Sequence, residues 1–302
     1  MQNKLVCTKN RNLHWLFMLP CLICLCISTG WPVLRTLYFS FTDASLECLE
    51  CHTFIGLENF TNLLTDTEWW QAIQNTAIIT FISVFFETII GMMLALVLHK
   101  NFKGRGFLRV AVLIPWVVPT IVSAQMWSWM LNDIYGVVNH MLLSSNLIES
   151  PIPWIASNFM SIVSIIIVDV WKTTPYMALL LLAGLQSLPQ ECFEAADVDG
   201  IPPIKKFTRI TLPLMYKTIA VAVLFRALDA VRIFDLVYMM TGGNSASSTM
   251  SVFVRRHLFD YTDIGYGSAA ATLLLFVVAL IGIFYISLKS GKKEEFSKTE
   301  CV

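Results

Sequence analysis

Residues 187–213, SLPQECFEAADVDGIPPIKKFTRITLP, form a polar and charged stretch between two long apolar runs. Ser187 and Gln190 have the spacing of a capping box, which predicts the start of a helix. Gly200 can close this helix in a left-handed turn, and the two prolines that follow it can begin a second helix. The stretch therefore predicts two short helices with a tight break between them.

Two interpretations of this helical stretch are open. It can be an ordinary loop between membrane spans, or it can be built to dock on another molecule. We expect Phe193 and Phe207 to be exposed on it, and exposed phenylalanines in a folded loop favour docking. Glu191 and Glu194 stand near the predicted helix start, where negative charge is favoured.

The same stretch resembles the EAA loop of the membrane subunits of bacterial ABC importers. The resemblance rests on Glu194, Ala195, Ala196, Asp199, Gly200, Ile210, Leu212 and Pro213. It implies that residues 187–213, the EAA-like loop, form a coupling helix that sits in a cleft of a separate ATPase subunit. The alternative is a chance Glu-Ala-Ala tripeptide in a polar loop.

The composition of the whole chain indicates a membrane protein. Of its 302 residues, 56% are hydrophobic and 14% are charged, which is too little charge to cover a soluble domain of this size. The predicted fold class is all-α, a polytopic integral membrane protein with six transmembrane helices. The stretches that reach the roughly 20 apolar residues of a spanning helix are about 13–35, 75–98, 107–131, 159–183, 216–240 and 267–288.

Lysine and arginine predict the orientation, because they are enriched in cytoplasmic loops. Fifteen of the twenty-one stand in the N-terminal segment, the C-terminal tail, and the loops between spans 2 and 3 and spans 4 and 5. The alternate loops hold three. We therefore expect cytoplasmic segments at residues 1–12 and 289–302 and a six-span domain at 13–288. The EAA-like loop is then on the cytoplasmic side.

The first external loop, at about residues 36–74, contains two features with open interpretations. Cys48 and Cys51 precede His52, and we favour unpaired cysteines over a disulfide or part of a metal site. A structural zinc site needs four ligands, and no second ligand pair stands nearby. Trp69 and Trp70 are either an interfacial aromatic belt or a landing site for a soluble partner.

Charged residues occur inside two of the predicted spans, where each costs a few kcal/mol unless it is paired or hydrated. Asp169 and Lys172 stand in the fourth span, and Arg226 and Asp229 stand in the fifth. At 1.5 Å per residue, both sets lie about 15–20 Å from the span ends. Two interpretations of these charges are open. They can form ion pairs that hold the helices together, or they can line a polar translocation path.

The charges of the fifth span alternate in sign at every third residue. They continue from Asp229 to Arg232 and Asp235, so neighbouring charges can pair along one helix. Glu87, in the second span, is interpreted as a lone acid that faces the helix bundle or a partner subunit.

Residues 75–288 also resemble sugar permeases of the maltose/trehalose type, in particular the larger of their two permease subunits. The similarity includes Thr241-Gly242-Gly243, although the next two residues depart from the usual Gly-Pro, and the start of span 3 at Ile114-Pro115. In that family the spans before and after the EAA loop line the sugar site. The lining positions that this implies are Asp169, Lys172, Thr173, Tyr176, Arg226, Asp229, Ala230 and Ile233.

Several classes of function are not supported by the sequence. It contains no G-x-x-x-x-G-K-[ST] phosphate loop, so this chain should not hydrolyse ATP. No Ser/His/Asp or metal-ligand constellation stands out, and the basic residues form no nucleic-acid patch. We therefore expect no enzyme activity, no catalytic or metal-binding residues and no cofactor, with ATP bound by a partner subunit.

The resemblance implies a permease subunit of an ATP-driven sugar importer in the bacterial inner (plasma) membrane, for a disaccharide such as trehalose or maltose. The implied partners are a second permease, two copies of a cytoplasmic ABC ATPase, an external sugar-binding protein, the sugar and the lipid bilayer. One alternative is a proton- or ion-coupled secondary transporter with Asp169 or Asp229 as the proton site. Another is an ABC importer for glycerol phosphate or oligosaccharides.

Overall fold

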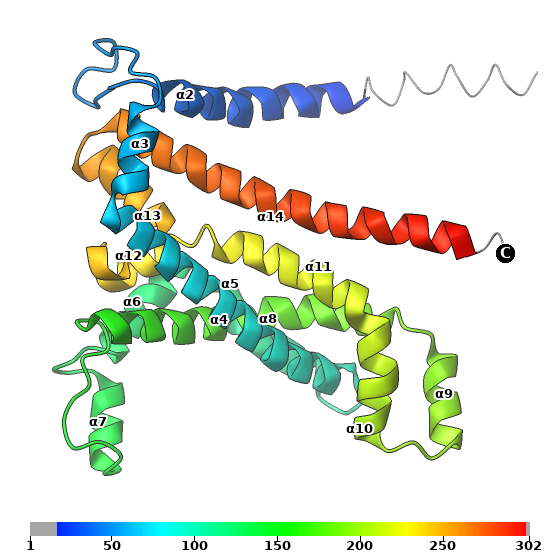
Figure 1. The fold of residues 1–302 in the computed structure, drawn as a ribbon. Helices are drawn as coiled ribbons and strands as arrows, with labels where there is room; N and C mark the ends of the chain where they lie inside the picture. The colour runs from blue at the N-terminus through cyan, green and yellow to red at the C-terminus, as the bar shows by residue number, and fades with distance from the viewer. Residues whose placement is uncertain (1–16, 300–302) are drawn as a thin grey trace, which may run out of the picture. The chain divides into compact units, whose positions relative to one another are not determined.

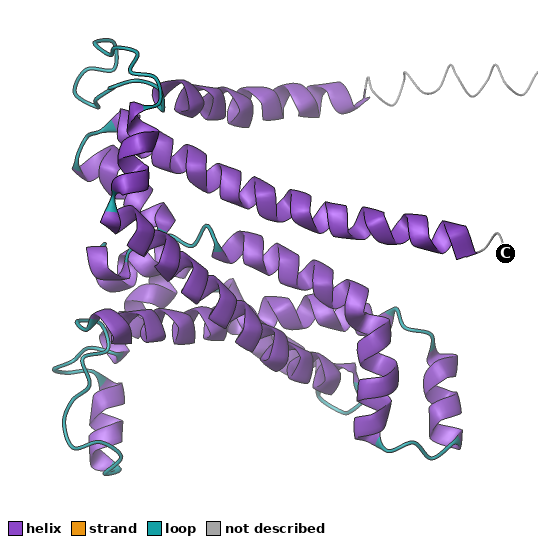
Figure 2. Cartoon of the chain, in the orientation of Figure 1, coloured by secondary structure: helices purple, strands orange, loops and turns teal. Residues whose placement is uncertain are grey.

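The protein is almost entirely helical (Figure 1, Figure 2). The computed structural model describes residues 17–299, with the backbone alone at residue 286 and at residues 288–299. Within this range, β pairing is limited to two isolated bridges. The chain divides into two compact units, one with residues up to Thr65 and Val254–Leu273, the other with Asp66–Phe253 and the residues from Leu274 onward. The expected segment 1–12 and residues 300–302 of the expected tail lie outside the described residues.

The first unit joins the end of the N-terminal helix to the start of the last helix. Buried Asn59 anchors the connection, because its amide donates to the carbonyl oxygens of Ser40 at 3.1 Å and Thr42 at 2.8 Å. A β-bridge between Ser45 and Asp263 ties the same loop to the last helix. The helical elements here are the helix Phe17–Phe39 with η1 (Cys26–Gly30) and α2 (Trp31–Phe39), then α3 (Glu58–Thr65), η4 (Arg256–Asp260) and the start of α14 (Ile264–Thr299).

Cys48 and Cys51 form a disulfide in the loop between α2 and α3. The prediction that favoured unpaired cysteines is therefore wrong. The ring of His52 contacts the Leu49 carbonyl oxygen at 2.7 Å and the Tyr38 hydroxyl at 3.0 Å. Nowhere in residues 17–299 do three His, Cys, Asp or Glu side chains gather as metal ligands.

A carboxylate also fixes this loop. The Thr53 hydroxyl donates to Asp43 at 2.7 Å, and the Thr53 backbone N–H donates to the same carboxylate. These hydrogen bonds hold the pKa of the Asp43 carboxyl below its usual value. The contact is therefore complete at neutral pH and is lost as the pH falls through that lowered pKa.

The second unit is centred on α4 and α8, which pack along their length (Figure 1). Glu87 lies beside Thr173 and Gly91 lies beside Met177, so the two helices run in the same direction. A Cβ at Gly91 would lie 2.9 Å from Met177 Cγ, so this approach requires glycine. The elements of this unit are α4 (Thr67–His99), α5 (Arg105–Val117), α6 (Thr120–Met130), α7 (Val137–Ser144), α8 (Asn158–Gln186), α9 (Gln190–Val198), α10 (Pro203–Lys206), η2 (Phe207–Thr211), α11 (Leu212–Ala230), α12 (Asp235–Thr241), η3 (Ser245–Ser247), the first residues of α13 (Met250–Arg255) and the rest of α14.

Helix α11 runs antiparallel to α8. Arg226 contacts Asp169, whereas Thr218, earlier on α11, lies against Gly184, later on α8. A parallel pair followed by an antiparallel neighbour is the order that alternating membrane spans require. Buried apolar side chains of α4, α8 and α11, among them Met177, fill the space between the three helices.

Two of the six predicted spans are broken. The expected span 107–131 is a pair, α5 and α6, bent by 86° at Val118-Pro119. The residue before a proline is pushed toward extended backbone, and Val118 has ψ 131°. Within residues 17–299, five single helices are long and apolar enough to cross a membrane, and the bent pair makes six. They are Phe17–Phe39, Thr67–His99, Asn158–Gln186, Pro203–Ala230, Ile264–Tyr285 and the pair Arg105–Val117 with Thr120–Met130.

The fifth span differs from its predicted bounds of 216–240. The long helix begins at Pro203 and ends at Ala230. After a break, α12 begins at Asp235. Arg232 lies in the break, where its Nε donates to the Leu228 carbonyl oxygen at 3.1 Å. The prediction of four alternating charges on one helix is therefore wrong beyond Asp229.

The two neighbouring tryptophans of α4 have different surroundings. Trp69 is buried, and its ring centroid lies 5.2 Å from that of Phe253. Trp70 is exposed. They therefore do not form one surface patch, and only Trp70 is placed to face lipid or a partner.

The packing of α4 on α8 yields a first prediction. Gly91→Leu should lower the thermal unfolding midpoint of the purified protein, because overpacking a tight contact costs about 1–3 kcal/mol. Gly282→Leu in α14 is the control, since no described atom lies within 4 Å of a Cβ at Gly282. Equal midpoints for the two variants would show that the α4–α8 contact does not depend on glycine.

Candidate functional site: a buried charge cluster and a helical loop

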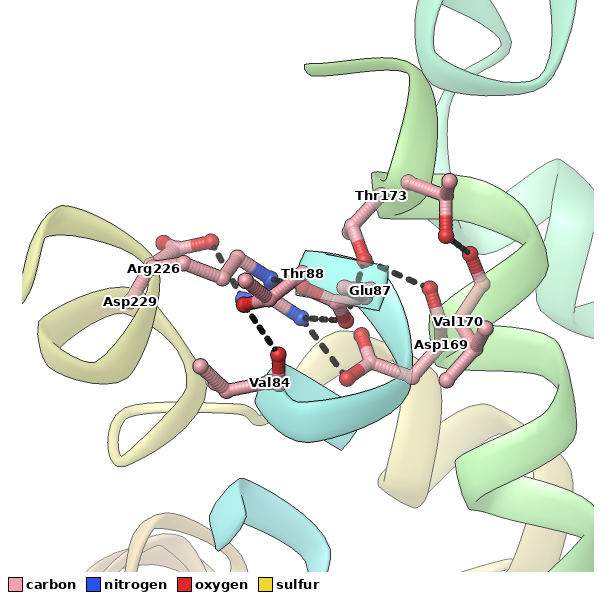
Figure 3. Close-up of polar contacts among 9 residues, drawn as sticks. Val84, Glu87, Thr88, Asp169, Val170, Thr173, Arg226 and Asp229 are labelled. Atoms are coloured by element: carbon pink, nitrogen blue, oxygen red, sulfur yellow. Dashed lines mark hydrogen bonds and ion pairs between the residues drawn. The ribbon is translucent and has the colours of Figure 1, made fainter. Parts of the chain in front are cut away.

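Arg226 of α11 lies at the centre of a buried cluster of charges (Figure 3). Its Nε donates to Glu87 Oε2 at 2.6 Å, and its Nη2 donates to Glu87 Oε1 at 3.1 Å. Nη2 also donates to Asp169 Oδ2 at 2.7 Å. Helices α4, α8 and α11 therefore each contribute one residue to this ion-pair network. The Arg226 side chain is 2% exposed, so its ion pairs with Glu87 and Asp169 are shielded from solvent.

Thr173 and Asp229 complete the cluster on opposite sides of Arg226. The Thr173 hydroxyl lies 2.7 Å from Glu87 Oε1 and 2.6 Å from the Asp169 carbonyl oxygen. Asp229 Oδ2 accepts from Arg226 Nη1 at 3.0 Å, but the Asp229 side chain is 68% exposed. The cluster thus combines one guanidinium with three carboxylates, and one of these carboxylates remains accessible.

The two other predicted lining residues of α8 contact the bend of the third span. Lys172 Nζ donates to the Val118 carbonyl oxygen at 2.6 Å. The Tyr176 ring stacks on Trp116, with centroids 5.6 Å apart and an interplanar angle of 12°. Lys172 therefore satisfies a carbonyl group at the break between α5 and α6, where helical hydrogen bonding is interrupted.

Ala230 and Ile233 lie outside the charge cluster. Ala230 is fully buried and belongs to the apolar core between α4, α8 and α11. Ile233 is half-buried in the break before α12 and packs on a second apolar cluster. Of the eight predicted lining positions, four meet in one network: Asp169, Thr173, Arg226 and Asp229.

Glu87 is the cluster member whose partner the sequence did not reveal. Its interpretation as a lone acid is wrong, because it has two contacts with Arg226 and one with Thr173. A carboxylate in the apolar run 75–98 is itself a signal that a buried cation lies nearby. Arg226 lies 139 positions away in the chain, so sequence spacing could not identify it.

The EAA-like loop contains two helices, α9 and α10, joined by a tight turn. Gly200 has φ +66°, and the Ile201 N–H donates to the Ala196 carbonyl oxygen at 3.0 Å, which closes α9 in a Schellman-type end. Pro203 begins α10. Lys206 pairs with Asp197 and so links the two helices. The predicted turn at Gly200 is confirmed, whereas the second predicted short helix is the start of the continuous helix Pro203–Ala230.

The expected capping box is absent. The helix α9 begins after Pro189, and no side chain caps it. The Ser187 hydroxyl donates instead to the Gly184 carbonyl oxygen at 2.7 Å, at the end of α8. That carbonyl group lies in the last turn of α8, where it also accepts from the Ser187 backbone N–H at 3.1 Å, so Ser187 caps the end of α8 and not the start of α9.

A known family matches residues 87–289 of this chain, namely the binding-protein-dependent transport system inner membrane component. The match covers more than half of the chain, including the charge cluster and the EAA-like loop. The chain belongs to this family. It is a multi-pass membrane protein and a permease subunit of a sugar ABC importer, which works with a second permease, an ATPase and a substrate-binding protein. ATP is hydrolysed by the separate ATPase subunit, so the permease is not an enzyme.

The similar proteins include permeases for different sugars. The trehalose/maltose transport system permease protein MalF of Thermococcus litoralis is 39% identical over 94% of this chain and 95% of that protein. The trehalose transport system permease protein SugA of Mycobacterium tuberculosis is 36% identical over 92% of this chain and 89% of that protein. The sulfoquinovosyl glycerol transport system permease protein SmoG of Agrobacterium fabrum is also 36% identical, over 92% of this chain and 91% of that protein.

The fold of the permease also resembles a solved structure. A chain of a bacterial alginate ABC transporter, in complex with an alginate pentasaccharide-bound periplasmic protein, superimposes with a TM-score of 0.79. The alignment covers 92% of this permease and 93% of that chain at 22% identity. This likeness supports the arrangement of helices and carries no information on the sugar.

The EAA-like loop of the permease presents a different apolar surface from the one that was expected. Phe193 and Phe207 are only half-exposed, and Phe207 packs on the core of α4, α8 and α11. Val198 is 89% exposed and Ile204 is 79% exposed, one on each helix of the loop. The prediction of exposed phenylalanines is therefore wrong, and the aliphatic pair Val198 and Ile204 takes their place.

The charge cluster yields a second prediction. Arg226→Met should strongly destabilise the permease, because it leaves Glu87 and Asp169 buried without a cation, at a cost of about 3–5 kcal/mol. Arg232→Met is the matched control, since the side chain of Arg232 is exposed and donates to the Leu228 carbonyl oxygen, not to a buried carboxylate. The thermal midpoint of the purified importer complex measures both. An Arg226→Met complex as stable as the control would contradict the central role of the cluster.

Proposed function

We propose that this permease forms half of the translocation path for a neutral disaccharide of the trehalose or maltose type. Two lines of support converge on this substrate class. Relatives at 39% and 36% identity are named as trehalose/maltose and trehalose permeases. The charge cluster also leaves an accessible carboxylate, Asp229, beside a buried network, and carboxylates are dense acceptors for sugar hydroxyl groups.

The proposed path follows the polar side of α8 and the end of α11. Asp229 accepts hydrogen bonds from sugar hydroxyl groups, and Thr173 supplies a neutral hydroxyl group on the other side of Arg226. Asp169 and Arg226 form the floor of the path, where they are already paired with each other. Tyr176 presents an aromatic ring for the apolar face of a sugar, and Lys172 supplies an ammonium group at the bend of the third span.

Half-buried Ile233 contributes apolar wall to the same path, and fully buried Ala230 packs behind that wall in the core. Ala230 is a small residue where α11 ends, and Ile233 follows in the break before α12. A break in a membrane helix next to a polar cluster is the arrangement that transporters use to bring irregular backbone to a cavity. The observation that carries the proposal is Asp229, an accessible carboxylate held by a buried arginine.

Coupling to ATP hydrolysis is assigned to the EAA-like loop. We propose that α9, with Glu194, Ala195 and Ala196, enters a cleft of the ATPase subunit, while Asp199 and Gly200 form its turn. Leu212 and Pro213 connect the loop to α11. The exposed Val198 and Ile204 are suited to an apolar contact on that partner.

The proposed cycle needs two ATPase copies and an external sugar-binding protein. Closure of the ATPase pair pulls on the EAA-like loops, the permease halves rock to face outward, and the binding protein releases sugar to the path. The permease is placed in a bacterial plasma membrane with both termini in the cytoplasm, as the distribution of lysine and arginine favours. The chain is proposed to need no cofactor of its own.

The substrate class is testable with the reconstituted importer. The permease, its second permease, the ATPase and the binding protein should hydrolyse ATP several-fold faster with trehalose or maltose than without sugar. Glycerol-3-phosphate and sulfoquinovosyl glycerol are the comparison substrates. Stimulation by an anionic substrate alone would remove the disaccharide proposal, and uptake driven by a proton gradient without ATP would favour a secondary transporter.

The turn of the EAA-like loop provides a separate test of coupling. Gly200→Val should reduce sugar uptake and binding of the ATPase, because a β-branched residue at φ +66° costs about 1–2 kcal/mol or more. Gly200→Asn is the matched control, since asparagine tolerates left-handed backbone. Uptake by the valine variant at the level of the asparagine variant would contradict a coupling role for this turn.

A further inference from the structure

Glu87 on α4 is completely buried, and both of its carboxylate oxygens accept hydrogen bonds. Oε2 accepts from Arg226 Nε at 2.6 Å. Oε1 accepts from Arg226 Nη2 at 3.1 Å and lies 2.7 Å from the Thr173 hydroxyl (Figure 3). Two contacts between one carboxylate and one guanidinium fix the plane of the guanidinium as well as its position.

The remaining donors of Arg226 are nearly all used. A guanidinium has five N–H groups. The Nε–H and Nη2 contacts serve Glu87 and Asp169, and an Nη1–H serves Asp229. Arg226 therefore cannot engage a sugar with more than one donor unless it releases a carboxylate. Arg226 is therefore placed to hold other side chains in position, and Asp229 is the exposed carboxylate among them.

One carboxylate of the cluster is not needed to neutralise buried charge. The buried acids Glu87 and Asp169 are matched by two buried cations, Arg226 and Lys172. Asp229 is the third carboxylate that Arg226 contacts, and its side chain is 68% exposed. A carboxylate that is exposed and yet fixed by a buried arginine is suited to accept hydrogen bonds from the hydroxyl groups of a ligand.

We propose that Glu87 is a positioning residue of the sugar path. It locks Arg226 in one orientation, and Arg226 in turn holds the exposed Asp229 carboxylate toward the passing sugar. The proposal deepens the function proposed above and rests on it, because it assigns to the second span a part in sugar recognition. It requires no contact between Glu87 and the sugar.

The test uses the complete reconstituted importer and the ratio of sugar molecules imported to ATP molecules hydrolysed. In Glu87→Gln an amide N–H₂ faces an N–H donor of Arg226, so one of the two contacts is lost. Loss of a charge-assisted hydrogen bond should lower this ratio about tenfold. A purely structural role would lower uptake and ATP hydrolysis together and leave their ratio unchanged. Glu149→Gln, at an exposed acid of the loop before α8, is the matched control.

A double-variant cycle connects Glu87 to Asp229. If Glu87 acts through Arg226 on Asp229, then Glu87→Gln combined with Asp229→Asn should lower the ratio no further than Asp229→Asn alone. Independent, multiplying effects would overturn the proposal. A normal ratio for Asp229→Asn alone would instead overturn the proposed sugar path, so the two failures are distinguishable.

Glu87→Asp is a second variant that tests the proposal if the importer complex with Glu87→Gln does not assemble. This variant keeps the charge that Arg226 needs but shortens the side chain by one methylene group, so the complex should assemble with a displaced guanidinium. Its ratio should lie between those of the wild type and Asp229→Asn. An assembled Glu87→Asp importer with the wild-type ratio would overturn the positioning role and leave Glu87 as a structural ion-pair partner.

Discussion

Arg226 carries a permanent positive charge in the middle of an apolar helix bundle, and the arrangement of three helices follows from how that charge is neutralised. Moving an ion out of water costs several kcal/mol, which only close and well-aligned partners offset. Glu87 on α4 and Asp169 on α8 provide them at 2.6 and 2.7 Å. Apolar packing brings the helices together, but it tolerates small sliding movements. The ion pairs do not, so they select one register of α4, α8 and α11.

The same constraint separates the roles within the cluster. Glu87 and Asp169 are buried and saturated by Arg226, whereas Asp229 is held at one oxygen and remains accessible. An accessible carboxylate on a mobile side chain would bind sugar hydroxyl groups weakly, because each contact would first require ordering of that side chain. Fixing Asp229 through Arg226 removes part of that cost before a sugar arrives. Stability and the proposed recognition thus depend on one arginine.

The sequence was sufficient to predict features that depend on local chemistry. The apolar runs identified the spans, and Gly200 with the prolines after it predicted the turn of the EAA-like loop. Features that depend on distant partners were missed. Glu87 was interpreted as a lone acid because Arg226 lies 139 positions away. The capping box at Ser187 failed because a carbonyl group of α8 competes for its hydroxyl. The bend at Pro119 was hidden within a continuous apolar run.

The position of the EAA-like loop relative to the charge cluster bears on how a movement at one reaches the other. The loop connects α8 directly to the helix that leads into α11, and the same two helices carry Asp169 and Arg226. From the cluster to the loop, each helix extends roughly 20–25 Å at 1.5 Å per residue. Both are continuous over that distance, and they meet tightly where Thr218 packs on Gly184. A displacement of α9 and α10 therefore acts on both α8 and α11, and these two helices are joined by the Asp169–Arg226 ion pair. Such a pair can tilt as one body without breaking the buried ion pair, so the least costly response to movement of the loop is a shift of α8 and α11 together.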